Sequence, residues 1–165
     1  MNADYKVPFY SQYDLDIEKS WQNKACGLAS VMMLIHYYKG EPVDSKNLFE
    51  TAIKNNAYLP NIGFKHRELA ELASNYNLKG ENFDWFKLDI EEAFNKLLSL
   101  LETQPVIASI YSHFDPENKN GHLIVLTGFD KENIFYNDPQ AGPDKSISIE
   151  DFLKGWKKRI IVIKK

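Results

Sequence analysis

One segment constrains the fold more than any other. The pattern from Cys26 to Lys39 predicts a helix that is apolar on nearly every side, and Gly40 follows as the residue that ends it. Its apolar residues are Leu28, Ala29, Val31, Met32, Met33, Leu34 and Ile35. A helix of this kind belongs inside a domain, so other elements must surround it. The 165 residues of the chain are enough for one domain with a substantial core, and we expect a single domain over residues 1–165.

The order of the remaining elements indicates an α+β fold. Helices are predicted at Asp44 to Asn56, at Phe64 to Tyr76, and from Asp89, where Glu92 completes a capping box. Short segments rich in Val, Ile and Phe follow and predict strands at Pro105–Tyr111, His122–Phe129, Asn133–Tyr136, Ser146–Ile149 and Arg159–Ile163. Because helices come first and strands later, we expect an antiparallel C-terminal sheet rather than the alternating units of a Rossmann fold.

The less regular segments give weaker predictions. Val7 to Tyr10 and Asn82 to Leu88 have the composition of short strands, and Glu150 to Trp156 that of a short helix. The polar stretch from Ser11 to Lys24 is interpreted as a loop.

Composition excludes several classes of function. The chain has 20 basic and 23 acidic residues and a formal net charge of −3, so it lacks the basic excess typical of a nucleic-acid binder. Its longest apolar stretch, Leu28 to Ile35, is interrupted by Ser30 and too short to span a bilayer. The start of the chain, Met1 to Tyr10, has no signal-peptide pattern, which leaves the compartment open.

Cys26 is the single cysteine of the chain. One thiol cannot form an intrachain disulfide, a redox pair or a cysteine-rich zinc site, so Cys26 is either a small buried apolar residue or a reactive one. Its place at the start of a helix favours reactivity. The unpaired N–H groups and partial positive charge there stabilise a thiolate, and the N–H of Cys26 itself can donate to an oxyanion.

His122 and Asp138 are predicted partners of this thiol. His122 begins one strand and Asp138 ends the next, so a hairpin would bring the two side chains together. Taken alone, His122 could be structural and Asp138-Pro139 a simple turn. Together with Cys26 they provide a nucleophile, a base and a group that orients the base.

The sequence also resembles a known family in four segments. They are Val-Pro-Phe-Tyr-Ser-Gln at 7–12, Ala-Cys-Gly-Leu-Ala-Ser at 25–30 with Met32, Gly-His-Leu-Ile-Val-Leu-Thr-Gly at 121–128, and Ile-Phe-Tyr-Asn-Asp-Pro at 134–139. These segments resemble the papain-like cysteine peptidases related to the bacteriocin-processing, double-glycine leader peptidases, above all their stand-alone relatives. The resemblance implies a papain-like fold, Cys26 as nucleophile, His122 as general base and acid, and Asp138 as the residue that orients His122.

The resemblance further implies a glutamine that donates to the oxyanion. Gln12, which follows the Val-Pro segment, is favoured over Gln22, which lies closer to Cys26 in the sequence. The implied partner is a peptide or protein substrate, no cofactor or metal is expected, and an exported or cell-surface location is possible by resemblance.

Three alternatives stay open at this point. The acyl-thioester that would form on Cys26 could be passed to an amine instead of water, which would make the protein an acyltransferase. The fold could also serve as a non-catalytic peptide-binding module. A metal site at His113, Asp115 and His122 can be imagined, but the segment around His113 reads as a polar loop without a further strong ligand. His66 is predicted to be structural or at the surface.

Overall fold

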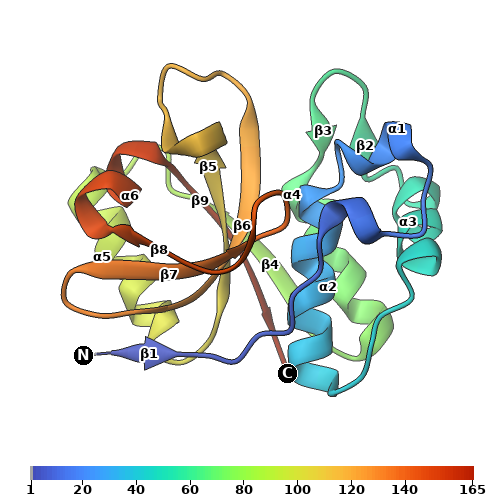
Figure 1. Ribbon diagram of the computed structural model, residues 1–165, viewed down its shortest axis with the longest axis horizontal. Coiled ribbons are helices and arrows are strands. Elements are labelled where there is room, and N and C mark those ends of the chain that lie inside the picture. Colours follow the sequence, from blue (N-terminus) through green and yellow to red (C-terminus); the bar gives the residue numbers. More distant parts are fainter. Residues whose placement is uncertain (1) are drawn as a thin grey trace.

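The computed structural model describes residues 2–165 and contains one large antiparallel sheet with helices on both of its faces (Figure 1). The strands occur in the order β4-β9-β5-β6-β7-β8, and β1 pairs with β6 outside this path. Their bounds are β1 (Ala3–Asp4), β4 (Lys79–Asp84), β5 (Val106–Tyr111), β6 (Gly121–Phe129), β7 (Asn133–Asp138), β8 (Gly142–Ser148) and β9 (Trp156–Lys164). The α+β class and the antiparallel sheet are therefore confirmed.

The helices and a small hairpin complete the chain. The α-helices are α1 (Lys19–Gln22), α2 (Cys26–Lys39), α3 (Ser45–Lys54), α4 (His66–Glu71), α5 (Ile90–Leu101) and α6 (Ile149–Gly155). Short 3-10 helices are η1 (Gln12–Asp14), η2 (Leu72–Tyr76) and η3 (Ser112–Phe114), and β2 (Tyr58–Leu59) pairs with β3 (Gly63–Phe64).

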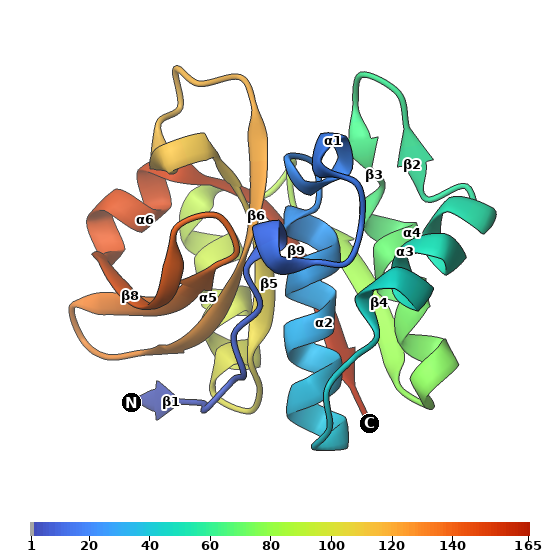
Figure 2. The ribbon, with the colours of Figure 1, turned by 45° about the vertical axis from the view of Figure 1, so that its right-hand side comes forward.

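Alternating side chains of the sheet build two cores. Ile107, Val125 and Ile161 belong to the core around α2, whereas their neighbours Ala108 and Ile124 belong to the core that includes α5 and α6. This two-residue period is the usual result of strand geometry, in which successive side chains point to opposite faces. Figure 2 shows the outcome, with α2 between the sheet and the pair α3 and α4.

Helix α2 has the bounds that the sequence predicts. Residues 27 to 35 are all buried, and Gly40 ends the helix with a φ of +73°. Glycine adopts this left-handed conformation without the steric penalty that a side chain would bring. The surrounding cores supply the burial that an all-apolar helix requires.

Several predictions at the N-terminal side were wrong. Val7 to Tyr10 is not a strand, because Pro8 has no N–H to donate and the N–H of Val7 donates to the carbonyl of Tyr5 instead (3.0 Å). The predicted loop from Ser11 to Lys24 contains η1 and α1. Elsewhere β4 begins and ends a few residues earlier than Asn82 to Leu88, and the hairpin β2–β3 was not predicted.

The β6–β7 hairpin sets the geometry of the candidate site. Val125 pairs with Asn137 and Leu126 with Tyr136, so the first residues of β6 lie beside the last residues of β7. The turn is stabilised by Asp130, whose carboxylate accepts hydrogen bonds from the N–H groups of Glu132 and Asn133 (both 2.8 Å).

Candidate active site

His122 and Asp138 are in direct contact at the open end of this hairpin. His122 Nε2 lies 2.7 Å from Asp138 Oδ1, and the two side chains are only 8% and 14% exposed. Asp138 Oδ1 also accepts a hydrogen bond from the N–H of Gln140 (2.8 Å), which holds the carboxylate in place. Since Nε2 is occupied by Asp138, Nδ1 is the ring nitrogen that remains for Cys26.

The partners of His122 favour its charged form. Burial lowers the pKa of His122, but the hydrogen bond with Asp138 and the nearby Cys26 and Asp138 groups raise it more, so that this pKa lies at about 10. Burial likewise raises the pKa of Asp138, but hydrogen bonding and the charge of His122 hold it below its usual value. The surroundings of His122 therefore stabilise an imidazolium paired with the carboxylate of Asp138.

Cys26 is the first residue of α2 and is partly exposed. The next residue, Gly27, lets the helix start lie directly on β6. A Cβ at Gly27 would lie 2.6 Å from Leu69 Cδ1 and 3.1 Å from Leu123 Cδ1, so a side chain there would force these leucines to shift. Since Leu123 follows His122, this close packing brings the start of α2 up to the start of β6.

Cys26 and His122 open into a cleft of about 900 Å³. The hairpin β2–β3 and the start of α4 line one side of it, and the end of β5 and the start of β6 line the other. In Figures 1 and 2 the β2–β3 hairpin and the β5–β6 connection project from the same end of the molecule. A segment of extended peptide has the dimensions to occupy such a cleft beside the thiol.

Gln12 and Gln22 have different surroundings. Gln12 lines the cleft with Cys26, and its side chain donates from Nε2 to the carbonyl of Gln22 (2.9 Å). Its Oε1 is buried and has no partner within residues 2–165, and one hydrogen of Nε2 is not used by Gln22. Gln22 instead donates its side-chain N–H to the carbonyl of Leu15 (3.1 Å). The structure thus brings Gln12, rather than the Gln22 side chain, to the cleft.

The sequence did not single out Asn137 or the basic residues of the cleft. Asn137 is 2% exposed, donates from Nδ2 to the carbonyl of Val7 (3.3 Å) and accepts from the N–H of Asp144 (3.0 Å). It thereby ties the N-terminal segment and β8 to the strand that carries Asp138. In the sequence, Asn137 is only an Asn at the end of a strand, where Asn is a common turn residue, so nothing there indicated that it is buried.

The imagined metal site does not form. Within the described part of the chain, no group of three or more His, Cys, Asp and Glu side chains is placed to hold a metal ion. His113 lies in η3 with a φ of +60°.

Across residues 2–165, no helix combines the length and the apolar character that crossing a membrane would need.

The His122 pair predicts a pH dependence of stability. Because the pKa of folded His122 is raised from 6.5 to about 10, its contribution is complete below pH 6.5 and is lost as the pH rises toward 10. We expect the difference in unfolding free energy between wild type and His122→Gln, measured by urea denaturation, to shrink over this window. The decline should be smaller in an Asp138→Asn background, which lacks the carboxylate. A difference that stays constant with pH would contradict this account.

Comparison with solved structures places the fold among papain-like peptidase domains of the double-glycine type. A double glycine motif protease from an AMS/PCAT transporter, solved with its leader peptide, is 23% identical with a TM-score of 0.66, covering 98% of this chain and 94% of that one. A protein described as a C39-like peptidase from Bacillus anthracis is 21% identical with a TM-score of 0.69, covering 100% and 98%. The peptidase domain of Streptococcus ComA is 16% identical with a TM-score of 0.64, covering 91% and 95%.

A family model matches most of the sequence and identifies the family of the chain. The profile described as the Peptidase_C39 like family matches residues 5–160, and the chain belongs to this family. A search of the curated proteins finds no significant match. Family and fold together support a function of the cysteine-peptidase type.

Proposed function

We propose that the protein is a papain-like cysteine peptidase that acts as one domain over residues 1–165 and hydrolyses a peptide or related amide bond at Cys26. The observation that carries the proposal is the 2.7 Å contact of His122 with Asp138 in the cleft that also contains Cys26. A histidine with a carboxylate on one nitrogen and a thiol on the other is the arrangement that thiol hydrolases use.

The proposed reaction has two stages. The Cys26 thiolate attacks the carbonyl carbon, and the carbonyl oxygen becomes an oxyanion that accepts hydrogen bonds from the backbone N–H of Cys26 and from the free Nε2 hydrogen of Gln12. His122 then gives its Nδ1 proton to the amine, which leaves, and an acyl-thioester remains on Cys26. In the second stage His122 takes a proton from water, the hydroxide attacks the thioester, and the acid and the thiolate are released.

Asp138 acts in this scheme through His122. Its carboxylate accepts from Nε2, which fixes the ring so that Nδ1 faces the thiol, and its charge stabilises the imidazolium. The pKa of about 10 for His122 keeps the ring protonated at neutral pH, which suits a resting imidazolium–thiolate pair.

The proposed partner is a peptide or protein segment. One of the solved structures with this fold holds a leader peptide, and the cleft of this chain is large enough for several residues of a peptide. Transfer of the acyl group to an amine would require a second substrate in the same cleft, and product analysis by mass spectrometry with and without an added amine separates the two reactions.

Selective alkylation tests the proposal against a non-catalytic binding module. With one cysteine in the chain, iodoacetamide or an epoxide peptidase inhibitor reports on Cys26 alone. Near pH 6 we expect folded protein to be alkylated at least about tenfold faster than protein unfolded in urea, because an ordinary thiol is almost fully protonated there. Intact mass spectrometry follows the reaction. A folded thiol that reacts no faster than the unfolded one would reject the peptidase and favour the binding module.

A further inference from the structure

The cleft beside Cys26 is strongly basic in a chain of net negative charge. Six basic residues line it, while only two acidic ones do, and the chain as a whole has a formal charge of −3. The basic residues are Lys24, Lys65, Arg67, Lys119, Lys157 and Arg159. Three of the basic residues have a carboxylate partner, Lys65 with Glu68 (3.5 Å), Arg67 with Glu71 (3.1 Å) and Arg159 with Asp84 (3.2 Å). Lys24, Lys119 and Lys157 take part in none of the ion pairs found within residues 2–165. The cleft therefore retains uncompensated positive charge.

A bulge in β9 presents part of this charge. Ser109 pairs with Arg159 but Ile110 pairs with Trp156, so two residues, Lys157 and Lys158, are inserted into the strand at this point. Lys158 adopts a φ of +58°, an uncommon conformation for a residue with a side chain.

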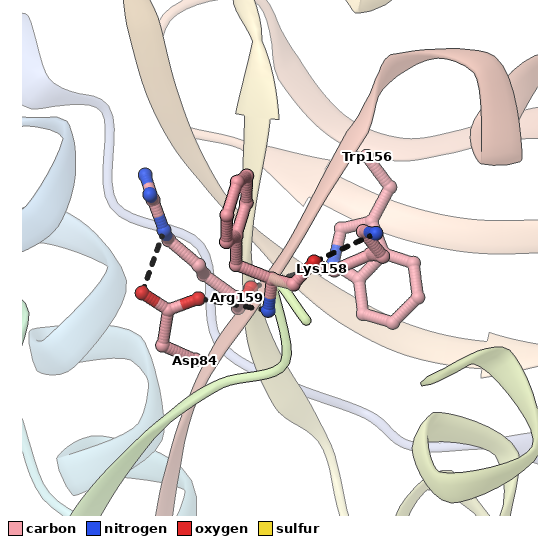
Figure 3. A network of polar contacts seen from close by, with 5 residues as sticks. Asp84, Trp156, Lys158 and Arg159 are labelled. Atoms are coloured by element: carbon pink, nitrogen blue, oxygen red, sulfur yellow. Dashed lines mark hydrogen bonds and ion pairs between the residues drawn. The ribbon is translucent and has the colours of Figure 1, made fainter. Parts of the chain in front are cut away.

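Polar contacts hold the bulge in this shape (Figure 3). Lys158 donates from Nζ to the carbonyls of Phe86 (3.1 Å) and Leu88 (2.8 Å), and the indole N–H of Trp156 donates to the carbonyl of Arg159 (3.3 Å). The guanidinium of Arg159 lies against Asp84, as the dashed line in Figure 3 shows. The bulge is thus anchored on both sides of Lys157.

Lys157 places its ammonium group beside Gly121 and Tyr111 in the lining of the cleft. A Cβ at Gly121, the residue before His122, would lie 3.3 Å from Lys157 Nζ. The same ammonium lies 5.4 Å from the centre of the Tyr111 ring. Lys157 takes part in none of the ion pairs found within residues 2–165.

Arg159 and His66 face the same space. Burial lowers the pKa of His66, and the charges of Arg159 and Lys157 lower it further. Burial and the charge of Arg159 also lower the pKa of Lys157. Lys157 and Arg159 repel one another in the cleft, so an anion that enters between them is stabilised, and the imidazole of His66 can donate a hydrogen bond to it.

We propose that Lys157, Arg159 and His66 form an anion-binding subsite that receives an acidic side chain of the peptide substrate. This inference rests on the proposed function, since it names the class of peptide that enters the cleft. Unpaired positive charge continues around the cleft at Lys24 and Lys119, which suits several carboxylates along a peptide rather than one terminal carboxylate. A nucleic acid fits less well, because the basic residues lie in a cleft next to a thiol and the chain carries no overall positive charge.

Binding to a protein that cannot cleave tests the subsite independently of catalysis. The probes are dye-labelled, C-terminally amidated oligo-glutamate and oligo-glutamine, and fluorescence anisotropy with Cys26→Ala measures their affinities. We expect oligo-glutamate to bind more tightly, and Lys157→Gln to weaken its binding by roughly tenfold, the value of one charge-assisted hydrogen bond. Lys131→Gln, the same charge change in the exposed turn between β6 and β7, should leave it unchanged.

Four results would overturn the subsite. The first two are equal affinity for oligo-glutamate and oligo-glutamine, and equal weakening of oligo-glutamate binding by Lys157→Gln and Lys131→Gln. The third is that a peptide binds only when its C-terminal carboxylate is free. The fourth is that a single-stranded oligonucleotide displaces labelled oligo-glutamate as effectively as unlabelled oligo-glutamate does.

A second measurement separates the subsite from the peptidase activity. When the wild-type protein cleaves proteome-derived peptides, acidic residues should be enriched near the cut bonds, and Lys157→Glu should abolish that enrichment. Preferential binding of oligo-glutamate without any cleavage by wild type would support the subsite and reject the proposed function. Cleavage without acidic enrichment would reject the subsite and support the function.

Discussion

Replacing Cys26 with Ala is expected to reduce peptide cleavage by about 10⁴-fold or more, because the nucleophile is lost and water alone must attack the carbonyl. The assay is mass spectrometry of proteome-derived peptides after incubation with equal amounts of wild type and variant. Alanine is smaller than cysteine, and the site is partly exposed, so the fold should persist; circular dichroism and thermal unfolding verify this.

A serine variant sharpens this comparison. Cys26→Ser replaces the sulfur with a hydroxyl oxygen of similar size that does not ionise near neutral pH, so we expect its activity to fall nearly as far as that of the alanine variant. Full cleavage by either variant would show that the thiol takes no part in the reaction.

Replacing His122 with Ala is expected to lower cleavage by about 10⁴-fold as well, since the loss of one residue of a catalytic unit removes most of the activity of the whole unit. It should also bring alkylation of Cys26 near pH 6 down toward the rate of the unfolded chain, because no imidazolium is left beside the thiol. Asp138→Asn should cost less, since an amide oxygen can still accept from His122 Nε2.

The matched control for this prediction is His36→Ala. His36 lies near the end of α2 and contacts the hydroxyl of Tyr10 (2.9 Å), away from the cleft. It should leave both the cleavage and the alkylation rates close to wild type. Loss of activity in His36→Ala equal to that in His122→Ala would indicate a general loss of structure rather than of chemistry.

Much of this arrangement could be predicted from local patterns. The apolar run at 26–39, the capping Asp89 and the alternating strands gave the main elements, because burial and hydrogen bonding within these segments dominate their conformation. The approach of His122 to Asp138 followed from the short turn between β6 and β7, since a hairpin fixes its own register.

The parts that were not predicted depend on contacts between distant segments. The β9 bulge relies on Lys158 reaching the carbonyls of Phe86 and Leu88, some 70 residues earlier in the chain, and no local pattern encodes that contact. The strands β2 and β3 have two residues each and leave almost no periodic signal. The placement of Gln12 depends on the carbonyls of Gln22 and Pro139, which meet it only in the folded protein.

Gly27 has a mechanical consequence for the site. The Cβ position of Gly27 is only 2.6 Å from a methyl group of Leu69 in α4 and 3.1 Å from one of Leu123 in β6, so the start of α2 has little free space around it. The contact between His122 and Asp138 lies within the β6–β7 hairpin, whereas the alignment of Cys26 with His122 depends on two separate elements, α2 and β6. Packing at Gly27 therefore bears on the alignment of the thiol with the histidine, and the hairpin holds the His122–Asp138 pair independently of it.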